Sequence, residues 1–281
     1  MIDEIMDIFN IDKQLEEITK IQIEHRLKLI DFWGIEKGSR ILEIGCGQGD
    51  TTVPLAFSVG ESGFVLGVDI AQESYGAPET LAQARERIKS SSVGNQVEMK
   101  FDFDILKNNN IFKENEFDYI ILSHCLWYFE SYEILNNIID SVKPFGKKIC
   151  IAEWNPKVRL SEQLLHYTSV NIQAICESFK HSSQSNIRTM FYPSKIKETI
   201  LSSGFNILKE GSIYSPKMQD AIWEVNMTIQ LYPKEINLLS NIPENLRKLL
   251  LSQIEEIKEI KEIKDINCIK PMDVFCLMAI K

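Results

Sequence analysis

The sequence has no long apolar run, no cluster of basic residues and no export signal. No apolar run reaches the roughly 18 residues that span a bilayer, and the acidic amino terminus lacks the cationic start of a signal peptide. Acidic residues outnumber basic ones by 40 to 31, which disfavours binding to a phosphate backbone. We therefore expect a cytoplasmic monomer or homodimer with no nucleic-acid or membrane partner.

Paired cysteines are also absent. Four of the six cysteines lie in apolar, strand-like runs, and none forms the C-x-x-C pair of zinc sites. This spacing disfavours a disulfide framework and a metal site, and it indicates reduced, buried thiols. The cysteines are Cys46, Cys125, Cys150, Cys176, Cys268 and Cys276.

Short apolar runs alternate with helix-length segments in the first half of the chain. This alternation predicts a parallel sheet with helices on both faces. The predicted strands are 40–45, 64–70, 97–103, 117–124 and 147–154, and the helices between them are 51–59, 78–91 and 130–142. Helical spacing also marks 11–33, 160–180 and 216–231, while 195–213 is expected to form a helix followed by a strand, and 272–281 the last strand.

A three-residue repeat, QIEEIKEIKEIKDIN, occupies residues 253–267. We expect a helix here. Each step of three residues turns about 300°, so the isoleucines should drift around the helix surface and should not form one apolar stripe. A partly solvated helix is the simplest interpretation, and a partner-binding helix is the alternative.

The stretch ILEIGCGQGD, residues 41–50, contains three glycines in a G-x-G-x-G pattern. A strand that runs through glycines into a helix presents backbone N–H groups to a ligand. The third glycine comes one residue earlier than in the dinucleotide fingerprint G-x-G-x-x-G. The acids Glu43 and Asp50 also suit an amine better than two phosphates. A glycine-rich turn without a ligand is the alternative.

Asp69 stands at the end of the second predicted strand, twenty positions after Gly49. A carboxylate at this place can accept hydrogen bonds from both ribose hydroxyls. Capping of the following helix is the alternative role.

Together, E-I-G-C-G-Q-G, G-V-D-I and F-D-Y-I-I-L-S-H-C-L-W-Y-F resemble the class I S-adenosylmethionine-dependent methyltransferases. The resemblance covers residues 40–154 and, more weakly, 204–213. It implies a Rossmann-like α/β fold whose seven strands, mostly parallel, are ordered 3-2-1-4-5-7-6, and it implies S-adenosyl-L-methionine as cofactor. We expect one domain, 1–281, made of a helical cap (1–35), a cofactor-binding core (36–155), a helical insert over the active site (156–195) and a segment that completes the sheet (196–281).

The resemblance also implies the cofactor contacts. Gly45, Gly47 and Gly49 would line the methionine portion, Glu43 would act near its amine, and Asp69 would bind the ribose. Adenine would meet Asp102 or Asp104, and Ser123 would face the methyl group. The neighbours Cys46, Ile70 and Phe103 are assigned to the same site. The segment 75–78 adds a loop that could act as a lid.

Three residues are candidates for catalysis. His124, at the end of the fourth predicted strand, could serve as a general base, and Glu153 could hold or deprotonate the substrate. His166 lies on the inserted helix. A structural or orienting role is the alternative for His124, and a surface or packing role is the alternative for His166. Glu153-Trp154-Asn155 is not the Asp-Asn pair of metal-assisted members, so we predict no metal.

The predicted function is methyl transfer to an oxygen or nitrogen of a small molecule. An NAD(P)-dependent oxidoreductase is one alternative. A non-catalytic cofactor-binding or interaction protein on the same fold is the other.

Overall fold

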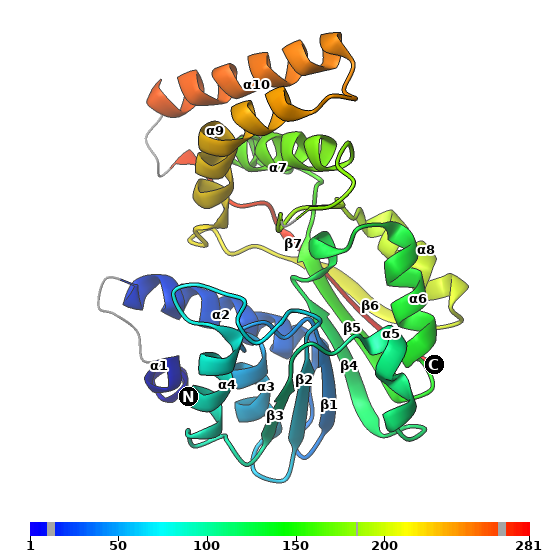
Figure 1. The fold of residues 1–281 in the computed structure, drawn as a ribbon. Coiled ribbons are helices and arrows are strands. Elements are labelled where there is room, and N and C mark those ends of the chain that lie inside the picture. Colours follow the sequence, from blue (N-terminus) through cyan, green and yellow to red (C-terminus); the bar gives the residue numbers. More distant parts are fainter. Residues whose placement is uncertain (10–14, 184, 264–267) are drawn as a thin grey trace.

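The computed structural model describes residues 1–9, 15–183, 185–263 and 268–281. Its centre is a seven-stranded sheet with the order β3-β2-β1-β4-β5-β7-β6 (Figure 1). β7 runs antiparallel to both β5 and β6, and the other pairs are parallel. The order implied by the resemblance is confirmed. The strands are β1 (Arg40–Ile44), β2 (Phe64–Val68), β3 (Val97–Lys100), β4 (Phe117–Ser123), β5 (Gly146–Trp154), β6 (Asn206–Ile213) and β7 (Val274–Ile280).

Helices cover both faces of the sheet (Figure 1). They bury the continuous apolar strands β1 and β4, as a parallel sheet requires. One group contains α1 (Ile2–Phe9), α2 (Glu16–Trp33), α3 (Thr52–Val59) and α4 (Leu81–Lys89). The other contains α5 (Ile105–Asn108), α6 (Tyr132–Val142) and α8 (Pro193–Ser202). The predicted start of the first long helix, at residue 11, falls outside the described residues.

Three further helices, distinct from the expected helical cap 1–35, pack around an apolar core of their own. We call these three helices the cap. They are α7 (Leu164–Glu177), α9 (Asp220–Leu238) and α10 (Glu244–Ile263). The cap lies beyond the end of the sheet from which β5 leads into α7 (Figure 1). Residues 196–281 supply β6 and β7, and they also supply α9 and α10, which pack with α7.

The isoleucine repeat behaves as the three-residue step dictates. Ile254 and Ile257 are 1% and 2% exposed, Ile260 is partly buried, and Ile263 is 84% exposed. The apolar side chains therefore rotate out of the cap core along α10. Residues 264–267 of the repeat lie outside the described residues.

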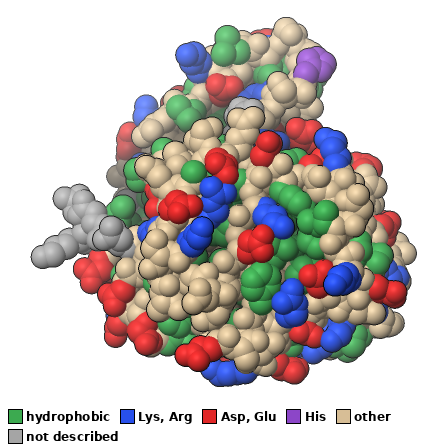
Figure 2. Space-filling view, turned by 60° about the horizontal axis from the view of Figure 1, so that its bottom comes forward, with side chains coloured by type: hydrophobic (Ala, Val, Ile, Leu, Met, Phe, Trp, Pro, Cys, Tyr) green, Lys and Arg blue, Asp and Glu red, His purple; other side chains and the backbone are tan. Residues whose placement is uncertain are grey.

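In the part of the chain that the structure describes, no helix is both long and apolar enough to cross a membrane. One face of the molecule carries acidic and basic side chains side by side, with hydrophobic side chains between them (Figure 2).

Two isoleucines of the repeat allow a matched test of the cap core. Ile257→Ala should lower the free energy of unfolding by about 2–5 kcal/mol, because the substitution leaves a cavity among packed side chains. Ile263→Ala, in the same helix and the same local sequence, should change it by less than about 0.5 kcal/mol. Urea denaturation followed by circular dichroism measures both. Equal losses for the two variants would contradict the observed rotation.

Candidate functional site

The glycine loop between β1 and α3 has two kinds of glycine. All three glycines have positive φ. A Cβ added to Gly45 would lie 2.6 Å from Cys125 Cβ, and one added to Gly49 would lie 2.4 Å from Ile88 Cδ1. A Cβ on Gly47 would meet nothing within 4 Å. Packing therefore explains Gly45 and Gly49, whereas Gly47 borders open space in which a ligand can approach the backbone.

Asp69 ties this loop to the end of β2. Its Oδ2 accepts a hydrogen bond from the Gly47 N–H and its Oδ1 accepts one from the Ala71 N–H, both at 2.9 Å. The next helix, α4, begins only at Leu81 and is capped by Thr80. A capping role for Asp69 is therefore wrong. The carboxylate keeps lone pairs for further donors such as ribose hydroxyls.

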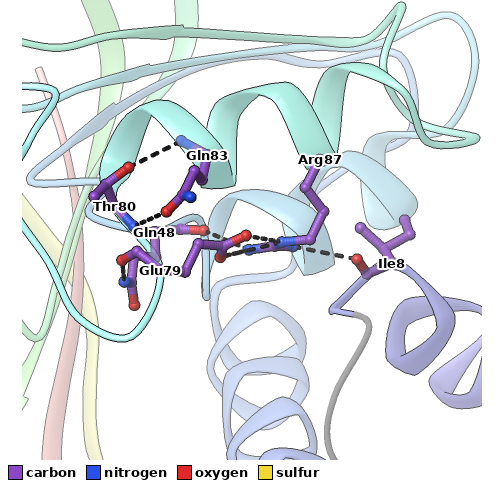
Figure 3. A network of polar contacts seen from close by, with 6 residues as sticks. All are labelled: Ile8, Gln48, Glu79, Thr80, Gln83 and Arg87. Carbon is purple, nitrogen blue, oxygen red and sulfur yellow. Dashed lines mark hydrogen bonds and ion pairs between the residues drawn. The ribbon is translucent and has the colours of Figure 1, made fainter.

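The expected lid segment is fixed at its base by a polar network (Figure 3). Arg87 of α4 pairs with both carboxylate oxygens of Glu79, with its Nη2 2.8 Å from Oε2 and its Nε 2.9 Å from Oε1. The same guanidinium donates to the backbone oxygens of Ile8 and Gln48, and the Gln48 side chain donates to the Glu79 carbonyl. The glycine loop, α1 and the end of the lid segment are thereby held together.

Glu43 is buried at the end of β1, where it is 2% exposed. Its Oε2 accepts a hydrogen bond from Thr52 Oγ1 at 2.6 Å. Burial raises the pKa of Glu43 to about 8, although the Thr52 hydroxyl acts in the opposite direction. The carboxyl group is therefore mostly protonated at neutral pH.

The two acids after β3 differ in what they bind. Asp104 caps α5 by accepting a hydrogen bond from the Leu106 N–H at 3.0 Å, and it pairs with Lys107 Nζ at 2.9 Å. Asp102 is exposed and has a φ of 51°, and its carboxylate has no hydrogen-bond partner among the described residues. Both stay predicted partners of adenine.

The three neighbours assigned to the cofactor site also differ. Cys46 is 4% exposed and points into the core, so that only its backbone could face a ligand. Ile70 is 68% exposed. The Phe103 ring lies 6.2 Å from that of Phe112.

His124 follows β4 in a left-handed backbone conformation, with a φ of 52°. A non-glycine residue in this region costs of order 1–3 kcal/mol and persists only where the surroundings impose it. His124 Nε2 lies 3.0 Å from His25 Nε2, and His124 Nδ1 lies 3.9 Å from Glu153 Oε1. The hydroxyl of the preceding residue, Ser123, is buried and has no hydrogen-bond partner among the described residues.

Glu153 is held by backbone amides at the end of β5. Its Oε2 accepts hydrogen bonds from the N–H groups of Leu126 at 2.9 Å and Trp127 at 3.3 Å, and its Oε1 accepts one from Trp154 at 2.9 Å. Burial raises the pKa of Glu153 to about 7, against the lowering effect of these amides. The group can therefore take or release a proton near neutrality.

His166, on α7, is fully buried. Its Nδ1 accepts a hydrogen bond from the Met272 N–H at 3.0 Å, so Nε2 carries the proton. Burial lowers the pKa of His166 to about 3. Its ring meets the Trp154 ring nearly edge to face, with centroids 5.2 Å apart.

Arg26 of α2 is a functional candidate that was not among the residues predicted from the sequence. It is 9% exposed, and its Nε and Nη1 are sealed without a hydrogen-bond partner among the described residues. Its positive charge acts on Glu43, Glu153 and Asp220, whose pKa values burial raises. A buried guanidinium with unpaired donors is costly, and an anionic ligand would satisfy it.

A signal for Arg26 does exist in the sequence. The inward face of α2 contains Ile23, Arg26, Ile30 and Trp33, all buried. A cation at helical spacing between apolar residues interrupts the apolar face, and this interruption marks Arg26. The pattern does not single out the adjacent His25, because the role of His25 depends on contacts with distant segments.

Comparison with known proteins agrees with the fold. Residues 35–215 match a family model described as a methyltransferase domain. The chain is 25% identical to a demethylmenaquinone methyltransferase of Shouchella clausii over 170 residues, which are 58% of this chain and 68% of the relative. It is 22% identical to that of Listeria welshimeri over 201 residues, 68% of this chain and 80% of the relative.

Two solved structures extend the comparison. A cyclopropane-fatty-acyl-phospholipid synthase-like protein from Lactobacillus casei is 27% identical, with a TM-score of 0.86, over 100% of this chain and 98% of its own. The phosphoethanolamine N-methyltransferase 2 of Haemonchus contortus, solved with S-adenosyl-L-methionine, is 18% identical, with a TM-score of 0.53, over 92% of this chain and 52% of its own. The matched family model covers more than half of the chain, and the chain therefore belongs to the methyltransferase-domain family as an S-adenosyl-L-methionine-dependent methyltransferase.

Proposed function

We propose that the enzyme methylates an oxygen or nitrogen atom of a small molecule. The observation that carries this proposal is His124, an imidazole held in a left-handed conformation at the end of β4 beside Glu153. An acceptor O–H or N–H must lose a proton when it is methylated, and a base at this place can take that proton. The names of the demethylmenaquinone and phosphoethanolamine relatives support a small-molecule acceptor.

The residues fit an amino-acid-bearing nucleoside. Gly47 borders open space, Asp69 has lone pairs to spare, and Arg26 has unpaired donors. S-adenosyl-L-methionine supplies an electrophilic methyl group when bound. We place its ribose at Asp69, its amine near Glu43 and its carboxylate at Arg26. Alignment of donor and acceptor and exclusion of water are then the main tasks of the protein.

The acceptor would enter between the sheet and the cap. The Trp154 ring lies 5.2 Å from the His124 ring, and Glu153 and His124 would meet the reacting atom. Since the chain is a methyltransferase, the NAD(P)-dependent oxidoreductase and the non-catalytic protein considered from the sequence are not supported.

Asp69→Ala tests the ribose contact. Loss of a charged acceptor of two hydrogen bonds should weaken binding of S-adenosyl-L-methionine by about 100-fold or more, as measured by isothermal titration calorimetry. Glu61→Ala, at an exposed acid in the turn before β2, is the matched control and should bind as the wild type does. Unchanged binding in Asp69→Ala would refute the assignment.

Arg26→Gln tests the carboxylate contact. Because a buried charge-assisted hydrogen bond contributes about 1.5–3 kcal/mol, the variant should bind S-adenosylhomocysteine about 10- to 100-fold more weakly than the wild type. Its affinity for the decarboxylated analogue should match that of the wild type, since no carboxylate is present. Lys28→Gln, at an exposed cation on the same helix, is the control. Equal losses for both ligands would show that Arg26 has another partner.

Glu43 predicts proton release on cofactor binding. At pH 7 its carboxyl group is mostly protonated, because burial raises its pKa to about 8. The cofactor ammonium should lower this pKa, so that binding releases close to one proton at pH 7 and none well above pH 8. Calorimetry in buffers with different ionisation enthalpies measures the release. Glu43→Gln, which can still accept from Thr52, should abolish it, and an unchanged release in this variant would exclude Glu43 as its source.

A further inference from the structure

Two histidines from distant parts of the chain are hydrogen-bonded to each other at the proposed reaction site. His25 Nε2 lies 3.0 Å from His124 Nε2, and His25 Nδ1 lies 3.0 Å from Ser215 Oγ. The three residues come from α2, from the loop after β4 and from the loop between β6 and α9. They form an unbroken row of polar atoms that ends at His124 Nδ1, which has no hydrogen-bond partner among the described residues.

The contact between the two Nε2 atoms limits the positions that the ring protons of His25 and His124 can take. A hydrogen bond between two imidazole nitrogens needs one proton, carried by one ring or by the other. If His124 carries it, then His25 is protonated on Nδ1 and donates to Ser215, and His124 Nδ1 is a bare acceptor. If His25 carries it, then Ser215 donates to His25 Nδ1, and His124 Nδ1 is protonated. The two arrangements differ by a shift of each proton along its hydrogen bond.

The surroundings favour uncharged rings. His25 is fully buried, and the His124 side chain is 10% exposed. Burial, followed by the charge of Arg26, lowers the pKa of both histidines well below the ordinary value, and Lys28 adds to this for His25. The other groups that face the pair are Glu153 and the ring of Trp154, which lies parallel to His25 and edge-on to His124. A lone imidazolium is therefore costly here.

We propose that His124, His25 and Ser215 form a proton relay that carries the acceptor's proton out of the site without a charged histidine. The inference rests on the proposed methyl transfer to O–H or N–H, which releases one proton for each methyl group transferred. The acceptor's O–H or N–H bond breaks as its oxygen or nitrogen gains the methyl group, and its proton binds His124 Nδ1. The Nε2 proton of His124 moves to His25 Nε2, and the Nδ1 proton of His25 moves to Ser215 Oγ.

Ser215 then passes its own hydroxyl proton to water, since it lies in the loop between β6 and α9 and is 8% exposed. One proton enters the row and one leaves it, so that no charge accumulates. After product release the His124 Nδ1 proton passes to water that enters the open site. The row then resets as Ser215 takes up one proton from water and the other two protons return along their hydrogen bonds. In this scheme His124 touches the substrate, whereas His25 and Ser215 act through it as positioning residues.

The coupling can be measured without an acceptor. The full chain contains four histidines, and long-range ¹⁵N–¹H correlation spectra of the protein with S-adenosylhomocysteine report which nitrogen of each ring carries the proton. Ser215→Ala removes the only acceptor that the described residues offer to the His25 Nδ1 proton. The relay predicts that this variant moves the proton of His124 to Nδ1, although His124 is connected to Ser215 only through the ring of His25.

Two controls accompany this measurement. Ser215→Thr keeps a hydroxyl and should keep the wild-type pattern. His166 is an internal reference, because the Met272 N–H fixes its proton on Nε2, and its signals should not move. An unchanged His124 in Ser215→Ala, or a charged His25 or His124 in the wild type at pH 7, would overturn the relay.

Turnover provides a second readout for any acceptor that the wild type methylates. His25→Gln keeps a donor and an acceptor but cannot pass a proton between two nitrogens. It should lower kcat by about 10-fold or more, while its Kd for S-adenosylhomocysteine stays within about twofold of the wild-type value. An unchanged kcat would overturn the relay. Failure of the wild type to bind S-adenosylhomocysteine would refute the proposed function instead, and spectra of the unliganded chain would still decide whether Ser215 and His124 are coupled.

Discussion

Burial at the carboxyl ends of β1, β4 and β5 sets the pKa values of Glu43, His124 and Glu153. Burial is the largest influence on Glu43, Glu153 and His166, and it shifts the pKa values of these groups to about 8, 7 and 3. Each shift favours the uncharged form. Arg26 places a guanidinium among them, with two nitrogens that have no hydrogen-bond partner among the described residues. The result is a site of low permittivity in which one cation lacks a balancing anion, and electrostatic attraction is strong in such surroundings.

An amino-acid zwitterion would complete this charge pattern. A carboxylate beside Arg26 satisfies the unpaired donors, and an ammonium near Glu43 stabilises the ionised form of that acid. The charges then alternate from Arg26 through the ligand to Glu43, and no group is left unbalanced. The helix α2 supplies Arg26 and also His25, so the proposed site is built from this amino-terminal helix as well as from the sheet.

Much of the fold could be predicted from the sequence, because the strands are continuous apolar runs and their crossovers follow general rules. The G-x-G-x-G loop and Asp69 were found because their spacing along the chain reflects one local strand–loop–helix unit. His25 and Ser215 could not be found in this way, since 190 positions separate them in the chain. Their meeting depends on how α2 and the loop after β6 pack against the end of β4. The insert expected at 156–195 contains α7, whereas α9 and α10, which pack with α7, come from the segment expected to complete the sheet.

The same burial that favours cofactor binding creates a problem for the reaction. A positively charged methyl donor becomes neutral as the acceptor is methylated, and the positive charge leaves as a proton. If that proton stayed on His124, an imidazolium would sit within reach of Arg26, whose charge already lowers the pKa of this ring. Glu153 could share it, but the two side chains lie 3.9 Å apart at their nearest atoms, beyond hydrogen-bond distance. A row of neutral donors and acceptors that leads from His124 toward the surface resolves this conflict, because it moves the charge without placing it on a buried ring.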